Sequence, residues 1–419
     1  MGHLLLVESW VGAMSTLLPR GIREGGHRFS FATRDLQHYL RSTPGPGPHP
    51  LLGAGNVLTV ETNDPDELLP HLERLQPILN FDGVATSCDY YLGTAARLAE
   101  RLGLPGPPPE AVERACAKDR TRLALREADV PGPAFALAES LRGLEEGAAA
   151  LGYPLVVKPA DLCAGMFVRE VADAGQLREA FEDIRSFPVN ARGQQRSPVV
   201  LLEERLTGAE VSVETVTFGG RTAVVGVTDK SVAGAPWFVE TGHMFPAALD
   251  AATEHRVTET AVAAIEALGL DNTVCHTELK LTEDGPKLVE VNPRPAGNQI
   301  TELVRRVTGI DLPAAYAQVA LGEKPDLSRV DTGAASAAIS FLLPPRSGPI
   351  EEIRGTEALR DPAVADFRVK PSGHHAGAAT SNNNYLGHVM VTSERPGAAR
   401  ARAEALIGSL DVRYAEDAA

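Results

Sequence analysis

The chain has 419 residues, which is too long for one small domain and fits two or three. Hydrophobic residues make up 43% and charged residues 23%, the balance of a globular protein, and the net charge of −15 argues against a nucleic-acid-binding surface. The four cysteines are scattered without a CxxC pair, which argues against a disulfide framework or a zinc site and indicates a reducing, cytoplasmic location.

The N-terminal part alternates strand-like and helix-like segments. The opening "MGHLLLVES" lacks a basic segment and its apolar run is too short to span a membrane, so we expect a buried strand over 3–9 and no membrane partner. A second apolar run covers 57–62, and "ELLPHLERL" and "TAARLAERLGL" have helical periodicity. The pattern predicts an α/β unit with a parallel sheet. The Pro- and Gly-rich stretch 42–55 is expected to be a loop, and its "GAGN" is a poor dinucleotide fingerprint.

A Pro-rich segment, "LPGPPPE" at 104–110, marks the expected end of this unit. Beyond it, residues 113–133 fit one amphipathic helix closed by Pro131. Residues 153–171 fit a strand, a short loop and a strand, and the polar stretch 189–198 is expected to be mobile. Residues 199–230 are expected to form strands that are broken by tight turns. A helix is expected around 252–268.

A β-hairpin is predicted at "HTELKLTEDGPKLVEVN", because Asp284-Gly285 is a strong turn signal between two alternating runs. Centring the register on residue 284 pairs 280 with 288, Glu278 with Glu290, and His276 with Asn292. The last four side chains then share one face. Facing glutamates repel each other unless a positive ion lies between them, and two carboxylates with an amide suit Mg²⁺. A solvated hairpin face is the alternative, and the hairpin alone does not decide between the two.

Charged residues also follow two other apolar strands. Lys158 ends "PLVVK" ahead of a loop of small residues, where its ammonium is suited either to phosphate oxygens or to plain solvent exposure. In "LLEERLTGAE" a strand ends in Glu203 and Glu204, with Glu210 beyond. A carboxylate there can accept both hydroxyls of a ribose, and the alternative is an ordinary charged turn.

In order and spacing, these segments resemble the ATP-grasp superfamily over roughly residues 113–312. The landmarks are Lys118 opening a helix in "AKDRTRLAL", Lys158 in "VVKP", the segment "LLEERLTGAE", Glu278, and the closing "VEVNPRPAG". The resemblance implies an α/β (α+β) ATP-grasp fold. The implied parts are an N-terminal Rossmann-like pre-ATP-grasp domain, a lid subdomain, a catalytic core and a small C-terminal subdomain, at 1–112, 113–200, 201–312 and 313–419.

The same resemblance implies the residues of a nucleotide and metal site. Lys118 and Lys158 would contact the phosphates of ATP, and Glu210 would hold the ribose. The segment that would hold the adenine contains Glu203, Glu204 and Leu206. The ligands of two Mg²⁺ ions, or of Mn²⁺ in their place, would be Glu278, Glu290 and Asn292. Arg294 would stabilise the transferring phosphate, which makes Lys158 and Arg294 the expected catalytic residues.

Within the superfamily, "HTELKL", "VETGHMFPA" and "NPRPAGNQITELVRRVTGIDL" resemble the carboxylate–amine ligases of the L-amino-acid ligase (dipeptide synthase) type. The implied reaction activates a carboxylate, such as an amino acid, as an acyl phosphate and joins it to an amine, with release of ADP and phosphate. The C-terminal region resembles the small subdomain of that group and of biotin carboxylase-like enzymes. Relatives carry a Ser- and Gly-rich loop after the lid lysine, whereas "ADLCAGMFV" retains only Gly165, so we expect a less complete phosphate cradle.

Several polar or aromatic side chains are candidate substrate contacts: His243, Arg294, Asn298, Trp237, His276 and Glu240. His243 is assigned to a loop, because "ETGHMFPA" has no helical or strand period, and a purely structural role is as well supported as a ligand contact. His276 alternatively supports the hairpin glutamates from behind. The expected partners are a small carboxylate and an amine, with no nucleic acid, and the expected assembly is a homodimer.

Two other functions stay open. One is an ATP-grasp carboxylase or phosphotransferase of the biotin carboxylase-like group, in which another acid receives the phosphate. The other is a nucleotide-binding scaffold without turnover, which the complete set of Glu278, Glu290, Asn292 and Arg294 argues against. Nothing in the sequence indicates a Ser/His/Asp triad.

Overall fold

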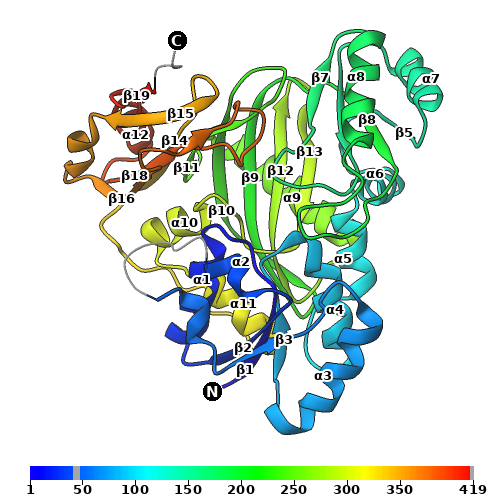
Figure 1. Cartoon of the computed structure of the whole chain (residues 1–419), viewed down its shortest axis with the longest axis vertical. Coiled ribbons are helices and arrows are strands. Elements are labelled where there is room, and N and C mark those ends of the chain that lie inside the picture. Colours follow the sequence, from blue (N-terminus) through cyan, green and yellow to red (C-terminus); the bar gives the residue numbers. More distant parts are fainter. Residues whose placement is uncertain (41–47, 416–419) are drawn as a thin grey trace.

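The computed structural model describes residues 1–40 and 48–415, so that residues 42–47 of the loop predicted at 42–55 lie outside the described residues. The chain runs from an N-terminal α/β part, drawn in blue, through a lid in cyan and green to a large central sheet and an orange and red C-terminal part (Figure 1). No helix among the described residues is both long and apolar enough to cross a membrane.

The N-terminal part is a parallel sheet with the strand order β3-β2-β1-β4. Alternate residues of β1 face different layers: Leu4 and Leu6 pack with α1 and α11, and Leu5 and Val7 pack with α3 and α4. Helices on both sides explain why the strand is apolar throughout. The elements are β1 (His3–Val7), β2 (Arg28–Thr33), β3 (Asn56–Thr59), β4 (Gly83–Ala85), α1 (Met14–Glu24), α2 (Leu36–Leu40), η1 (Pro50–Gly53), α3 (Pro65–Leu79), η2 (Asp89–Tyr91) and α4 (Leu92–Arg101).

The single helix predicted over 113–133 is wrong, because two helices cover this region. They are α5 (Pro109–Cys116) and α6 (Lys118–Glu127), separated by Ala117 in an extended conformation. The backbone N–H of Lys118 donates to the carbonyl of Ala160 instead of continuing α5. The break therefore starts a new helix at Lys118 and fixes this lysine against the loop that follows Lys158.

The lid is a four-stranded antiparallel sheet in the order β5-β8-β6-β7, covered by two helices. The predicted strand, loop and strand over 153–171 are confirmed as β6 and β7. The polar stretch 189–198 contains a bridge between Val189 and Gln195 and a buried arginine, Arg192. The elements are β5 (Phe135–Ala138), α7 (Leu141–Leu151), β6 (Leu155–Pro159), β7 (Arg169–Val171), α8 (Ala174–Arg185) and β8 (Val200–Glu204).

The central sheet has eight strands in the order β13-β12-β9-β10-β11-β14-β18-β16, so strands of the C-terminal part extend it at one side. The predicted helix near 252–268 is confirmed as α9, which begins at an Asp250 N-cap and ends at the left-handed Gly269. The elements are β9 (Ala209–Phe218), β10 (Arg221–Val232), β11 (Glu240–Phe245), α9 (Ala251–Leu268), β12 (Thr273–Thr282), β13 (Gly285–Asn292), α10 (Ile300–Thr308), α11 (Leu312–Ala320), β14 (Ser336–Leu342), β16 (Val364–Val369) and β18 (Gly387–Ser393).

A small sheet in the order β17-β15-β19 completes the C-terminal part. It packs with α12 and the end of the central sheet around buried residues that include Ile350, Leu386 and Leu406. The elements are β15 (Gly348–Arg354), η3 (Thr356–Arg360), β17 (His375–Ala376), α12 (Ala399–Gly408) and β19 (Asp411–Tyr414).

Candidate active site

The hairpin of β12 and β13 brings the predicted carboxylates together. Glu278 lies opposite Glu290 and His276 opposite Asn292, as the sequence predicted. The predicted pairing of 280 with 288 is wrong: an irregularity after Glu278 shifts the register, and Lys280 pairs with Lys287. The pairs nearest the open end of the hairpin are thus preserved, and the extra residue is absorbed between Glu290 and the turn.

Lys118 is bound to this hairpin. Its Nζ lies 2.8 Å from Glu290 Oε1 and donates to the carbonyl of Leu162 at 2.5 Å. Burial lowers the pKa of Lys118, but the Glu290 carboxylate more than offsets it, so the net shift is upward. The ammonium stays charged between the hairpin and the lid loop.

Lys158 belongs to a buried cluster with one carboxylate and two cations. Its Nζ lies 2.6 Å from Glu203 Oε2, and Arg122 Nε lies 2.5 Å from the other oxygen. Arg122 also donates to the carbonyl of Val289 at 2.7 Å. Burial lowers the pKa of Lys158 despite the nearby carboxylate, whereas Glu203 has a lowered pKa because its two cations outweigh its burial. The cluster carries one uncompensated positive charge, which an anion such as phosphate would neutralise.

The segment predicted to hold adenine and ribose lies beside this cluster. Glu204 Oε1 lies 2.9 Å from Lys287 Nζ on β13, and Leu206 is half-buried in the turn that follows β8. Glu210 is paired with Lys280 at 3.1 Å and with Lys230 at 3.2 Å. The Glu203 side chain is fully used by Lys158 and Arg122, so an adenine at this segment would meet the backbone and not that carboxylate.

Lys230 on β10 is a central residue of the site that the sequence reasoning missed. Its buried Nζ lies 2.6 Å from Glu278, 3.0 Å from Glu240 and 3.2 Å from Glu210. Burial lowers the pKa of Lys230, and the three carboxylates raise it well above its ordinary value. The sequence holds a weak signal: a lysine closes the strand-like run "AVVGVTDK", and a lysine buried in a sheet needs a charged partner.

His276 supports Glu278 from behind. Its Nε2 lies 2.9 Å from Glu278 Oε1, and its Nδ1 lies 3.1 Å from the fully buried Glu214. Burial lowers the pKa of His276, but the Glu214 and Glu278 carboxylates have the larger and opposite effect. The net result is a pKa raised to about 9. The imidazole is therefore protonated at neutral pH, which favours the supporting role over a direct substrate contact.

The loop assigned to His243 is wrong, because "ETGHMF" forms strand β11 between β10 and β14. His243 Nε2 lies 3.2 Å from Glu240, yet neither ring nitrogen makes a well-directed hydrogen bond among the described residues. Asn298 donates to the Glu240 carboxylate. The buried Nδ1 of His243, which has no partner among the described residues, is a reason to expect a ligand here.

The C-terminal run "SNNNYLG" closes one side of this group. Asn382 Oδ1 accepts from the Glu240 backbone N–H at 3.0 Å, and the Asn382 N–H donates to the lid carbonyl of Ala164 at 3.3 Å. Tyr385 stacks on Phe341 with ring centroids 4.3 Å apart. The run thus joins the C-terminal part to both β11 and the lid loop.

Two other predicted residues contact different parts of the chain. Arg294 donates to Asp89 Oδ1 from Nε at 2.9 Å and from Nη2 at 2.7 Å, so the N-terminal part supplies its partner. Burial lowers the pKa of Arg294, and Asp89 raises it above its ordinary value in sum. Trp237 lies near Arg169 of the lid, with the guanidinium 5.8 Å from the ring centroid. The structure thus brings Arg294, but not Trp237, into a contact with the hairpin end and the N-terminal part.

Glu278, Glu290 and Asn292 fit a magnesium site by the chemistry of their donors. No three His, Cys, Asp or Glu side chains of the described chain cluster in a way that could hold a metal ion, but two carboxylates and an amide still supply oxygen ligands. Each carboxylate has an ammonium partner within 2.8 Å, Lys118 or Lys230, as a facing pair of glutamates requires.

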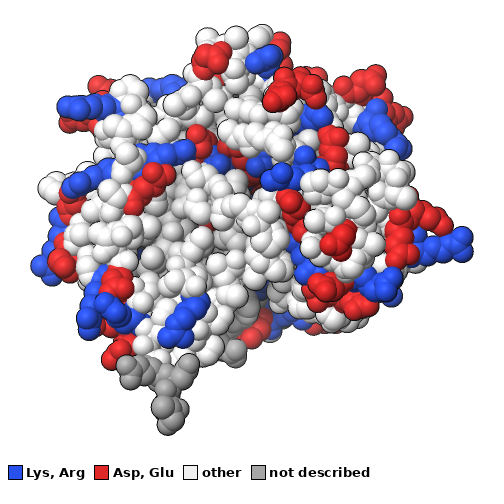
Figure 2. All heavy atoms as spheres, turned by 90° about the horizontal axis from the view of Figure 1, so that it is seen from above, with Lys and Arg blue, Asp and Glu red and all other residues white. Residues whose placement is uncertain are grey.

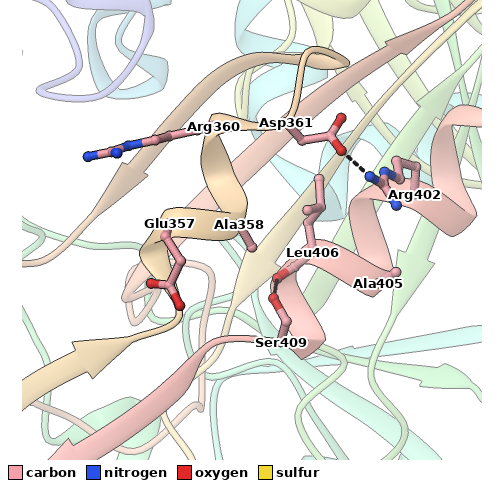
Figure 3. Close-up of a pocket in the computed structure, with 8 residues that line it drawn as sticks. All are labelled: Glu357, Ala358, Arg360, Asp361, Arg402, Ala405, Leu406 and Ser409. Carbon is pink, nitrogen blue, oxygen red and sulfur yellow. Dashed lines mark hydrogen bonds and ion pairs between the residues drawn. The ribbon is translucent and has the colours of Figure 1, made fainter.

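The surface of the molecule shows two further features. From above, Lys and Arg side chains are intermixed with Asp and Glu, without a field of one sign (Figure 2). A hollow of about 520 Å³ lies between η3 and α12 and is lined by residues that include Arg360 and the ion-paired Asp361 and Arg402 (Figure 3). It shares no residue with the charged clusters around the hairpin, and so it is not the candidate active site.

Three family models match the chain. They describe an ATP-grasp N-terminal domain over residues 36–106, an ATP-grasp domain over 151–302 and an L-amino acid ligase C-terminal domain 2 over 340–415. The second match contains Lys158, the segment "LLEERLTGAE" and the whole hairpin.

Individual proteins are similar over most of the chain. The uncharacterized protein y4rH of Sinorhizobium fredii is 29% identical over 376 residues, which cover 88% of this chain and 77% of that protein. Carnosine synthase 1 of Gallus gallus is 31% identical over 85% of this chain, but the chain spans only 38% of that protein's length. The crystal structure of an L-amino acid ligase from Bacillus licheniformis has a TM-score of 0.80 at 23% identity, over 99% of both chains, which shows a shared fold.

Proposed function

The chain is an ATP-grasp protein of the L-amino-acid ligase type, and from this premise we propose that it joins a carboxylate to an amine with cleavage of ATP to ADP and phosphate. The predicted family and fold class are confirmed. The observation that supports the proposed reaction is the meeting of two opposite charge clusters at one hairpin: a cation-rich one at Lys158 and a carboxylate-rich one at Glu278. Such a pair suits an anionic nucleotide bound together with a metal ion.

In the first step, a carboxylate oxygen of the substrate would attack the γ-phosphorus, and the bond to the β–γ bridging oxygen would break to release ADP. We assign Lys118, Lys158 and Arg294 to the phosphate oxygens, since they bring positive charge from α6, from β6 and from the segment after β13. Mg²⁺, which we propose as two ions held by Glu278, Glu290 and Asn292 and replaceable by Mn²⁺, would supply further charge neutralisation when bound.

In the second step, the amine nitrogen would attack the acyl carbon, phosphate would leave and the nitrogen would lose a proton. We assign the substrates to the region of His243, Glu240 and Asn298, where His243 Nε2 lies 3.2 Å from the Glu240 carboxylate and its buried Nδ1 has no partner among the described residues. Trp237 and His276 are weaker candidates, because each already has a partner within the protein.

An ADP-release screen of amino acids, singly and in pairs, with ATP and Mg²⁺ tests this proposal. We expect ADP release that depends on a pair, and a product mass that equals the two substrates less one water. A phosphorylated acid as the final product would instead indicate a phosphotransferase, and ATP binding without amine-dependent ADP release would indicate a scaffold.

The division into four parts, the homodimer and the cytoplasmic location remain proposals. Limited proteolysis would test the boundaries near residues 112, 200 and 312, and light scattering after gel filtration would test the dimer.

A further inference from the structure

A hairpin-like loop of the lid, residues 188–197, presents one arginine at its tip. The backbones of Val189 and Gln195 form a bridge across the loop. The side-chain oxygen of Asn190 accepts from the backbone N–H of Arg192 at 2.9 Å and of Gln194 at 3.1 Å. Hydrogen bonds within the loop therefore fix the shape of the tip, independently of the contacts that the tip makes with the N-terminal part.

Arg192 is inserted at the carboxyl ends of the N-terminal parallel strands and is only 6% exposed. Its guanidinium donates to the carbonyl of Ser9 and lies 5.7 Å from the Trp10 ring and 5.4 Å from the Tyr39 ring. Asn63 donates to the Arg192 carbonyl at 2.8 Å. Open α/β sheets bind their ligands at this edge, and here a side chain of the lid takes that place.

Three contacts lead from this arginine to the catalytic arginine. Arg192 lies over the Trp10 ring, Trp10 Nε1 donates to Asp89 Oδ2 at 2.5 Å, and Asp89 Oδ1 accepts from Arg294 at 2.7 and 2.9 Å. The Trp10 indole and the Arg294 guanidinium thus hold the two oxygens of one carboxylate.

The base of the same loop is tied to the phosphate side. Arg196 Nη2 lies 3.1 Å from Asp161, and the Ser197 N–H donates to the other oxygen of that carboxylate at 2.5 Å. Asp161 precedes Leu162, whose carbonyl accepts from Lys118. A movement of the lid loop would therefore move the loop of residues 188–197 with it.

We propose that Arg192 is a positioning residue that couples lid closure to the orientation of Arg294, through Trp10 and Asp89. This inference rests on the proposed ligase function. When the lid opens, Arg192 leaves the N-terminal edge, Trp10 loses a contact and Asp89 holds Arg294 less firmly. Phosphoryl transfer then waits until the lid covers the site, which protects the acyl phosphate from water.

The test compares R192M, W10F and the double variant with R185M. Arg185 is the matched control, because it is an exposed lid arginine whose guanidinium lies 6.0 Å from the ring of Phe181 and is not one of the groups that link Arg192 to Arg294. We expect R192M and W10F each to lower kcat about ten- to a hundredfold, with KM for ATP changed less than about threefold. The kcat of the double variant should be no lower than that of the less active single variant, since both substitutions act through Asp89. R192K, which retains the cation, should recover part of the loss.

A spectroscopic measurement keeps the test independent of turnover. The chain has two tryptophans, so W237F leaves Trp10 as the only indole, and a non-hydrolysable ATP analogue with Mg²⁺ should shift its emission. R192M in this background should lose the shift, and R185M should retain it.

Two results would overturn the coupling. One is a loss of kcat in R192M that is no larger than the loss in R185M. The other is a loss of kcat in the double variant that equals the product of the two single losses. Absence of amine-dependent ADP release from the unaltered protein would overturn the proposed function instead. Because the emission shift needs only nucleotide binding, it would still test the coupling in that case.

Discussion

The two buried charge clusters at the hairpin use the same residue types in opposite proportions. At Lys158, one carboxylate faces two cations, whereas around Lys230 four carboxylates (Glu210, Glu214, Glu240 and Glu278) face three cations (Lys230, Lys280 and the protonated His276). Because a buried charge is costly unless compensated, the first cluster favours an anionic ligand and the second a cationic one. The comparison teaches that the ratio of charges, and not the presence of lysine or glutamate, separates the phosphate side from the metal side.

Removing Glu290 should have the largest effect, because the two clusters meet at the hairpin that carries this residue. In E290A the hairpin loses a proposed metal ligand and Lys118 loses its carboxylate, so we expect ADP formation to fall at least about a hundredfold. Steady-state ADP release measures the effect, and circular dichroism checks the fold. E283A, an exposed glutamate at the turn of the same hairpin, is the control and should retain activity. Normal turnover in E290A would remove the argument from the hairpin.

Replacing Lys230 tests the carboxylate-rich cluster and should have a smaller effect than removing Glu290. K230M leaves three carboxylates without their shared ammonium, and we expect kcat to fall about tenfold or more. K280M is the control, since Lys280 contacts only Glu210 of the three carboxylates.

The pH dependence of K230M gives a second measurement. Burial raises the pKa of Glu240 and Glu278, but Lys230 lowers both below their ordinary range in sum. These carboxylates therefore stabilise the fold above their unfolded pKa, near 4.5, and lose that contribution only at lower pH. In K230M the loss should begin at higher pH, which melting curves from pH 4 to 8 would detect. If the melting temperature of K230M fell with decreasing pH in the same way as that of K280M, Lys230 would not be the group that lowers the pKa of Glu240 and Glu278.

Removing His276 should have the smallest effect, and one that depends on pH. The folded-state pKa of about 9 exceeds the ordinary 6.5, so its stabilising contribution is complete below pH 6.5 and is lost as pH rises through 9. The shift corresponds to about 3 kcal/mol at most. Denaturant unfolding at pH 6 and 9.5 should show this loss in the unaltered protein and in H255Q, an exposed histidine, but not in H276Q.

Much of the local structure was predictable because it depends on short-range patterns. The Asp284-Gly285 turn and the alternation around it predicted which hairpin residues face each other, and the pairs at 278 and 276 are confirmed. The irregularity after Glu278 has no such signal, because the extra residue on β13, Val289, fits the same run of residue types as its neighbours. Residues "ETGHMF" were wrongly assigned to a loop, since a strand buried between two others needs no alternation of polarity.

The residues that the sequence reasoning missed share one property: their partners are distant in the chain. Lys230 meets carboxylates from β9, β11 and β12, and Asp89 meets Arg294 across 205 positions. Neither residue belongs to a local motif, so nothing near it in the sequence marks it as part of a site.

By itself, the sequence determined many of the elements and the order of the landmark residues, because helical and strand periods, caps and turns are set by neighbouring residues. Only the tertiary structure decided the charge of each cluster, because a side chain's electrostatics depends on what surrounds it in space. Glu203 and Glu278 look alike in the sequence, yet Glu203 has two cations to itself, whereas Glu278 shares the Lys230 ammonium with Glu210 and Glu240 and the His276 imidazolium with Glu214. The packing of the lid, the N-terminal sheet and the hairpin makes that difference.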